Sequence, residues 1–245
     1  MTKPIVDVER FDRQIRLYGL GGQQKIAGCR VLVFKTGLEG SEMIKNLVLA
    51  GIASCSVFEN RAGIFHHNNK FEIDRIKRLN PRCDIKVVAD IDDEYDVIVY
   101  GSLQDEKILF KKKCLLYVLV QQYGNVGWFK LYDKPMDFKW TFDAKDMKRT
   151  KIQRKIGAVW PFVYALVTGK KTKKQITDQL MKWNTPIDEE LLELLITQKS
   201  VHENGLANIL SGFAAQETLA FISKGDAKLG TYSVDGYNLQ VLKIE

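Results

Sequence analysis

The stretch of residues 30–59 constrains the fold more than any other part of the chain. It opens with the apolar run of residues 31–34. An uninterrupted run of this length is typical of a strand buried on both faces of a parallel sheet. We expect a helix over residues 42–50 that ends at Gly51, followed by a second strand over residues 54–59. The pattern therefore predicts a βαβ unit.

The alternation of strands and helices continues beyond this unit, to about residue 120. Such alternation is typical of a doubly wound sheet with helices on its faces. We therefore expect an α/β fold with a Rossmann-like, mostly parallel sheet. The further elements that we expect are helices over residues 71–79 and 104–113 and strands over residues 85–88, 95–100, 115–120 and 124–132.

The composition along the chain suggests three parts. Residues 1–133 form the first part of the Rossmann-like domain. Residues 134–200 form a basic linker and a small helical insert, and residues 201–245 complete the domain. The elements that we expect in the last two parts are helices over residues 158–167, 175–183, 191–198 and 205–224, and two strands around the turn at Asp235 and Gly236.

The net charge of +7 is concentrated in the middle of the chain. Residues 111–174 contain 16 Lys or Arg and 4 Asp or Glu. This excess indicates either a solvated face or a surface that attracts an acidic partner. Nucleic acid is not the expected partner, because the aromatic residues are not arranged as stacking platforms beside the basic ones. The basic run of residues 145–155 is either a nuclear-import signal or a solvated loop.

No membrane or secretory segment is recognisable. No apolar run approaches the ~20 residues of a membrane span, and residues 1–9 lack the apolar core of a signal peptide. We therefore expect no membrane contact, and localisation in the nucleus, the cytoplasm or both.

The cysteines do not indicate a metal or disulfide framework. They lack any C-x-x-C spacing, so neither a zinc ribbon nor a disulfide is expected. A nucleophilic cysteine remains a minor alternative that needs a partner histidine. The residues concerned are Cys29, Cys55, Cys83 and Cys114, with His66, His67 and His202.

The loop after the first strand stands where a Rossmann-type fold binds phosphate through the pattern G-x-G-x-x-G. Here Lys35 replaces the first glycine, while Gly37 and Gly40 keep the other two. Glu39 adds negative charge, and Glu59 ends the second strand, where an acid can hold a ribose hydroxyl. This pattern favours a structural remnant over an intact nucleotide site. A dinucleotide-dependent oxidoreductase stays as an alternative.

Three arginines, Arg10, Arg13 and Arg16, follow one another at a spacing of three near the amino terminus. In a helix this spacing places them roughly on one face. Phe11 lies on another face, so the helix can dock while its guanidinium groups point outward. The arginines either bind phosphate or form a solvated face. We expect this helix to break at the Gly21-Gly22 pair.

The amino-acid sequence of these segments resembles that of a known family. Residues 10–20, 30–33 and 45–51 resemble the amino terminus of enzymes that activate ubiquitin and related proteins. The resemblance is closest to the smaller, non-catalytic subunits of the heterodimers that activate SUMO. It is strong over residues 10–60 and visible again over residues 206–245, and between them it rests on element order. The equivalent subunit for another ubiquitin-like modifier is an alternative.

The resemblance implies a role for one of the arginines. In this family the arginine of the R-[FY]-D-R-Q pattern reaches into the ATP site of the partner subunit, and Arg13 matches it. The resemblance also implies that the partner binds ATP, magnesium and the SUMO tail, and that SUMO contacts this chain mainly through the partner. Helices 42–50 and 205–224 are then the expected dimer surface.

The resemblance further implies that this chain has lost its own chemistry. In catalytic members a D-x-D motif comes directly after the second strand. At that place this chain has Glu59, Asn60 and Arg61. The R-x-x-[DN]-x-G-x-x-K segment and the paired C-x-x-C zinc ligands are also absent. We therefore expect this chain to bind no cofactor and no metal.

Overall fold

The computed structural model describes most of the two segments predicted to form the main domain. The described residues are 4–59, 63–67, 70–92, 94–102, 105–123, 126–134, 172–182, 187, 189, 192–193, 204–225, 229–235 and 240–244. The predicted linker and the helices expected over residues 158–167 and 191–198 lie outside these residues, except for Leu192 and Glu193. The boundaries of the three predicted parts stay a prediction.

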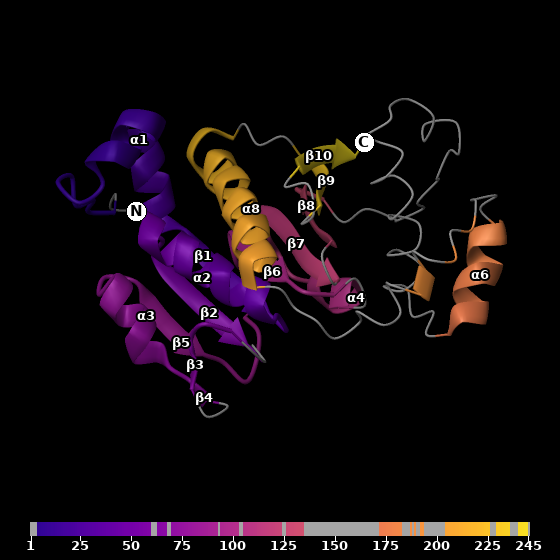
Figure 1. The fold of residues 1–245 in the computed structure, drawn as a ribbon. Helices are drawn as coiled ribbons and strands as arrows, with labels where there is room; N and C mark the ends of the chain where they lie inside the picture. The colour runs from indigo at the N-terminus through magenta and orange to yellow at the C-terminus, as the bar shows by residue number, and fades with distance from the viewer. Residues whose placement is uncertain are drawn as a thin grey trace.

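The described strands form one eight-stranded sheet with a short two-stranded sheet beside it (Figure 1). The strand order of the large sheet is β10-β9-β8-β7-β6-β1-β2-β5. The strands are β1 (Arg30–Phe34), β2 (Ser54–Phe58), β5 (Asp84–Val87), β6 (Val97–Tyr100), β7 (Leu116–Tyr123), β8 (Val126–Tyr132), β9 (Gly230–Asp235) and β10 (Gln240–Ile244), and the small sheet pairs β3 (His66–His67) with β4 (Lys70–Phe71).

The sheet confirms the predicted Rossmann-like α/β fold. Strands β5, β2, β1, β6 and β7 pair in parallel, and β7 to β10 pair antiparallel. The chain proceeds outward from β1 to β2 and β5, then returns to the other side of β1 with β6. This reversal makes the gap between β1 and β6 the topological switch point, where α/β sheets bind ligands.

Three helices cover one face of the sheet together with α3 (Ile73–Leu79). They are α1 (Asp12–Gly28), α2 (Leu38–Ala50) and α8 (Asn204–Lys224). Val31 and Val33 of β1 face this layer and are fully buried beneath α2 and α8. In Figure 1, α8 crosses in front of the sheet beside α1.

The opposite face of the sheet has its own apolar cluster. Leu32 and Phe34 of β1 lie there with Ile98 and Tyr100 of β6, packed against Leu109 of α4 (Glu106–Leu109). Strand β1 is therefore buried on both faces, as its uninterrupted apolar run predicts. Among the helices that the structure describes, which include α6 (Lys173–Lys182), none combines the length and the apolar composition of a bilayer span.

The first helix breaks at a different glycine from the one predicted. Gly19 has φ 75° and ψ 161°, while Gly21 and Gly22 continue the helix. Gly22 is held close to α8, since a Cβ on it would lie 3.1 Å from Cβ of Ser223. Gly19 adopts its positive φ without steric cost because glycine has no Cβ, and no neighbouring heavy atom lies within 4 Å of where a Cβ would stand.

Two other helix boundaries were predicted wrongly. Helix α2 begins at Leu38 rather than residue 42, because Gly37 serves as its N-cap and Gly40 packs directly on the side chain of Thr36. The helix expected over residues 104–113 is the single turn α4, which ends at Leu109. The predicted end of α2 at Gly51 is confirmed, with φ 94° at that residue.

Gly51 offers a direct test of this packing. A Cβ there would lie 3.0 and 3.1 Å from the two Cε atoms of the buried Phe11 ring, at a φ that favours glycine. We expect Gly51→Ala to lower the free energy of unfolding in urea by about 1–3 kcal/mol. Gly21→Ala is the control, because its new Cβ meets no heavy atom within 4 Å. Equal unfolding midpoints for Gly51→Ala and wild type would contradict the contact.

Candidate functional site

The predicted phosphate loop lies at the switch point of the sheet. Lys35, Gly37 and Gly40 follow β1 at the amino end of α2, and Gly101 follows β6. The backbone N–H of Lys35 donates to the carbonyl of Phe58, at 2.8 Å. The structure therefore brings the predicted loop residues together with Glu59, which directly follows Phe58.

Lys35 keeps the backbone conformation of the glycine that it replaces. Its φ is 47°, and Glu59 has φ 48°. A left-handed conformation costs a non-glycine residue roughly 1–2 kcal/mol. The side chain of Lys35 is held by neighbours: Nζ lies 3.9 Å from Oδ1 of Asp105 and 5.2 Å from the centroid of the Phe34 ring. The ammonium group at this loop is thus paired with an acid of the same chain.

The loop after β6 packs closely on the loop after β1. A Cβ on Gly101 would lie 2.9 Å from the carbonyl oxygen of Lys35 and 3.3 Å from Cα of Thr36. Thr36 is itself buried, and its side chain occupies the space beside Gly40. Gly63 approaches Ser41 from the other side, so that a Cβ there would overlap the Ser41 hydroxyl. Glycines are therefore needed where these loops pack closely on one another.

The amino end of α2 already carries a carboxylate. Glu39 is only 5% exposed, and its Oε2 lies 3.3 Å from where a Cβ on Gly37 would stand. A helix amino terminus favours a negative group, whether phosphate or carboxylate. Glu42, also buried, pairs with Lys45. Within the described ranges, no group of three or more His, Cys, Asp or Glu is placed to hold a metal ion.

The three arginines do not share one surface role. Arg10 precedes α1 and donates through Nη2 to the carbonyl of Leu79, so the expectation that all three lie on one helix is wrong. Arg16 pairs with Asp12, with Nη2 2.9 Å from Oδ2. Arg13 is exposed and forms no hydrogen bond or ion pair with another residue that the structure describes. It is therefore left available to a group outside this chain.

The cysteines lack the features of nucleophiles. Cys29, Cys55 and Cys83 are buried and Cys114 is half-buried, all as free thiols. Burial raises the pKa of the Cys83 and Cys114 thiols to about 12. Burial also raises the pKa of the Cys29 and Cys55 thiols. All four thiols therefore stay protonated near neutral pH, and the attacking thiolate is scarce.

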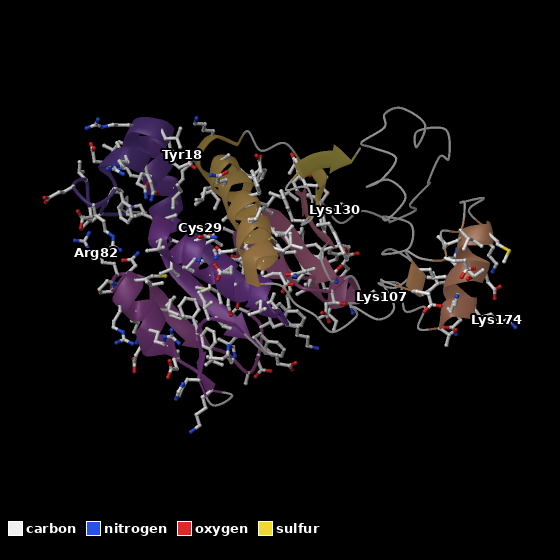
Figure 2. The ribbon with its side chains drawn as sticks, in the orientation of Figure 1. Tyr18, Cys29, Arg82, Lys107, Lys130 and Lys174 are labelled. Carbon is white, nitrogen blue, oxygen red and sulfur yellow. The ribbon has the colours of Figure 1, made fainter. Side chains whose placement is uncertain are left out.

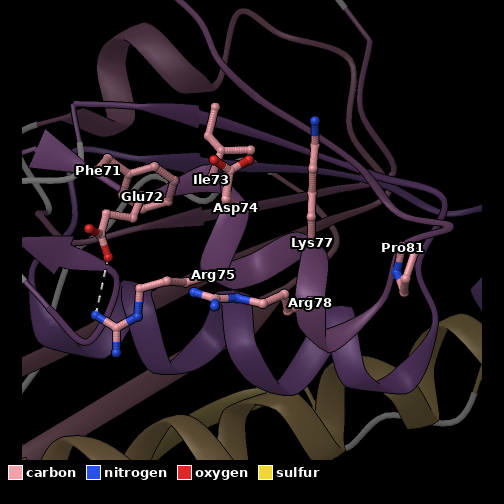
Figure 3. A pocket seen from close by; sticks show the side chains of 8 residues that line it. All are labelled: Phe71, Glu72, Ile73, Asp74, Arg75, Lys77, Arg78 and Pro81. Atoms are coloured by element: carbon pink, nitrogen blue, oxygen red, sulfur yellow. Dashed lines mark hydrogen bonds and ion pairs between the residues drawn. The ribbon is translucent and has the colours of Figure 1, made fainter.

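A groove that the sequence reasoning missed runs along α3 (Figure 3). It has a volume of about 980 Å³, and Glu72 in its wall pairs with Arg75 at 3.5 Å. The charges of its wall partly cancel, and no predicted site residue belongs to it. The sequence carries no specific signal for it, because the mixed charges of residues 72–78 are typical of any solvent-exposed helix. The lining residues are Phe71, Glu72, Ile73, Asp74, Arg75, Lys77, Arg78 and Pro81.

Sequence comparison identifies similar proteins over part of the chain. SUMO-activating enzyme subunit 1 of Rattus norvegicus and of Homo sapiens are each 31% identical over 96 residues, which span 33% of this chain and 28% of theirs. Subunit 1B-1 of Arabidopsis thaliana is 30% identical over 133 residues, 42% of this chain and 41% of its own length. No protein-family model matches the chain.

Structural comparison extends over nearly the whole chain. Escherichia coli MccB superposes with a TM-score of 0.62 at 12% identity, covering 98% of this chain and 70% of MccB. PaaA superposes with a TM-score of 0.63 at 11% identity, covering 100% of this chain and 76% of PaaA. At this identity the match establishes the fold alone.

The sequence comparison agrees with the resemblance that the motifs indicate, and the structural comparison agrees with the predicted fold. The sequence resemblance to SUMO-activating enzyme subunit 1 is confirmed over about a third of the chain, and the matched stretch spans well under half the length of those relatives. The chain therefore shares the fold of MccB-type enzymes and, in part, the sequence of SUMO-activating enzyme subunit 1.

Proposed function

We propose that this chain is the non-catalytic subunit of a heterodimeric enzyme that activates a ubiquitin-like protein, with SUMO as the modifier. The observation that carries the proposal is a contrast between two parts of the chain. Its own phosphate loop has Lys35 in place of the first glycine and the buried carboxylate of Glu39 at the helix terminus, whereas Arg13 is exposed and unpaired among the described residues. A chain that has lost its own site can still contribute to the site of another.

Arg13 is proposed to act as an arginine finger in the ATP site of the partner. A guanidinium is always charged and donates two parallel hydrogen bonds, which suits the oxygens of a triphosphate. Charge grows on those oxygens when the carboxylate of the modifier attacks the α-phosphate and pyrophosphate leaves. The start of helix α1, which carries Arg13, is anchored to the body of the protein because Phe11 is buried against Gly51.

The partner subunit is proposed to pack on the layer formed by α1, α2 and α8. Leu17 and Leu20 on α1, Leu49 on α2 and Phe213 on α8 are large exposed apolar residues of this layer. Helix α8 also carries no charged residue before Glu217. Loss of charge and exposed apolar side chains are typical of the core of a stable interface. This surface contains the two helices expected at the dimer contact.

The division of labour follows from these assignments. The partner would bind ATP, magnesium and the SUMO tail, form the acyl-adenylate and capture it as a thioester on its own cysteine. This chain would bind no cofactor or metal, and would contact SUMO mainly through the partner. We place the complex in the nucleus, the cytoplasm or both. Residues 145–155 are the candidate import signal.

A different ubiquitin-like modifier is the alternative substrate, because the matched stretch covers only about a third of this chain. Charging assays with a panel of ubiquitin-like proteins distinguish the two. A dinucleotide-dependent oxidoreductase is disfavoured by Lys35 at the first-glycine position and by the close approach of Gly101. A thermal shift on adding NAD or NADP would revive it.

The direct test of the proposal is ATP–pyrophosphate exchange in the presence of SUMO. The assay compares this chain alone, a candidate catalytic subunit alone, and the two mixed. We expect exchange in the mixture only. Exchange by this chain alone would contradict the proposed loss of its own chemistry, and no exchange in any mixture with any modifier of the panel would contradict the assignment.

Arg13→Ala tests the finger itself. We expect the variant to form the dimer but to slow exchange in the mixture by on the order of 10³-fold or more, as for other arginines that act in trans. The matched control is Arg78→Ala, an exposed arginine on α3 outside the proposed interface, which should leave exchange unchanged. Wild-type exchange by Arg13→Ala would remove the role assigned to this residue.

Lys35→Gly tests the proposed loss of nucleotide binding. The variant restores the first glycine at a residue that already has the left-handed backbone. We expect no magnesium-dependent ATP binding in calorimetry by the isolated variant, because Glu39 occupies the helix terminus and the metal-binding acids are still missing. Tight binding by the variant or by wild type would contradict the proposal that this chain has lost its own nucleotide site.

A further inference from the structure

Three buried side chains meet on the face of the sheet opposite α2 and α8. The hydroxyl of Tyr100 on β6 donates to Oε1 of Glu106 on α4 at 2.7 Å, and the hydroxyl of Tyr132 on β8 donates to the same oxygen at 3.1 Å. The two hydroxyls also contact each other. Tyr100 is 0%, Tyr132 4% and Glu106 9% exposed. None of the three takes part in the function proposed above.

A buried lysine completes the cluster. Lys130 on β8 is 4% exposed, and its Nζ lies 5.0 Å from the centroid of the Tyr132 ring. Lys130 is labelled in Figure 2. Burial raises the pKa of Glu106 to about 7, although Lys130 opposes the shift. Burial lowers the pKa of Lys130 to about 8, although Glu106 opposes the shift. Both groups therefore change charge close to neutral pH.

The cluster is connected to the loop after β1 by one residue. Glu106 opens α4, and its neighbour Asp105 is the N-cap residue of that helix and the partner of Lys35. The loop after β6, which leads to Asp105, is anchored by Gln121, whose Nε2 donates to the carbonyl of Gly101 at 2.6 Å. The attachment of α4 to the sheet thus decides whether Asp105 stays beside Lys35.

We propose that the cluster of Glu106, Lys130, Tyr100 and Tyr132 is a proton-operated latch. In its protonated form it holds α4 and the Asp105–Lys35 pair against the sheet, and it loosens them when Glu106 becomes charged. The device regulates the closure of the loop after β1, and it stands independently of the activity proposed above.

The direction of the effect follows from the charges that must be buried. An acid whose pKa is raised in the closed state stabilises that state fully below its ordinary pKa, and this stabilisation is lost as pH rises through the raised value. Closure of α4 therefore weakens between about pH 5 and pH 7, where the Glu106 carboxyl ionises. The lowered pKa of Lys130 acts in the opposite sense, so closure strengthens again above about pH 8.

Other charged or titratable groups nearby do not replace this pair. Lys107 on α4 itself is exposed. Tyr117 on β7 stacks on Tyr132, with ring centroids 5.5 Å apart, and donates its hydroxyl to the carbonyl of Lys112 at 2.9 Å. Asp105 and Lys35 pair with each other beyond the cluster. Glu106 and Lys130 are therefore the buried ionisable pair of this cluster.

Hydrogen exchange of residues 105–110 in the full chain tests the latch. After correction for intrinsic exchange, we expect the opening constant of this segment to rise roughly tenfold from pH 5.5 to 7.5 in wild type. Glu106→Gln keeps an acceptor for the two hydroxyls but cannot ionise, so its opening constant should no longer rise with pH over this range. The control is Glu94→Gln, an exposed acid paired with Lys113, which should behave as wild type.

Tyr132→Phe gives a second, independent readout. It removes one of the two hydroxyls that donate to Glu106 Oε1, so the charged carboxylate loses a donor. The midpoint of the pH dependence should therefore move to higher pH. A pH-independent opening constant in wild type, a wild-type dependence in Glu106→Gln, or an unmoved midpoint in Tyr132→Phe would each overturn the latch.

Discussion

The carboxyl end of α2 is the point on which the rest of the structure depends. The ring of Phe11 lies on the backbone of Gly51, and Gln23 of α1 donates to the carbonyl of Ala50 at 2.9 Å. Asn80, which follows α3, donates to the carbonyl of Val48 at 3.1 Å. Buried helix carbonyls are costly when left unpaired, on the order of 1–3 kcal/mol each. The amide side chains of two other elements therefore satisfy α2 and hold α1 and α3 in place.

This arrangement connects the fold to the proposed site. Arg13 lies two residues after Phe11, in the first turn of α1, so the contact of Phe11 with Gly51 anchors the end of the helix that carries Arg13. The two motif segments that resemble the activating enzymes, residues 10–20 and 45–51, are thus two sides of one packed contact. Their shared pattern reflects packing as well as function, which is why the resemblance alone predicts the fold better than it predicts the chemistry.

Sequence reasoning recovered those features that depend on local pattern. The apolar run of β1, buried on both faces, was enough to predict a parallel sheet, and Gly51 was enough to predict the end of α2. The break at Gly19 was missed because Gly21 and Gly22 carry the same local signal. The choice between them depends on the approach of Ser223, which is distant in the sequence. Glycine pattern alone cannot report such a contact.

The candidate site divides in the same way. The loop of Lys35, Gly37 and Gly40 was located from the spacing of its glycines. The residues that pack against this loop were not predicted. Asp105 beside Lys35 and Gly101 on Thr36 arrive from β6 and become neighbours only through the sheet order. The same holds for Glu106, Tyr100 and Tyr132, which come from separate elements. Taken one at a time, the sequence predicts Glu106 to be a surface acid and the two tyrosines to be core aromatics.

The conformation of Lys35 explains how a fold can keep the shape of a phosphate loop without its glycine. Its left-handed backbone costs roughly 1–2 kcal/mol, while α2 buries Met43, Ile44, Leu47 and Val48 almost completely between the sheet and α8. Burial of side chains of this size contributes about 1.5–3 kcal/mol each. The packing of α2 therefore outweighs the strain at Lys35 several times over. The backbone at the start of α2 is fixed by that packing, whether or not a nucleotide binds there.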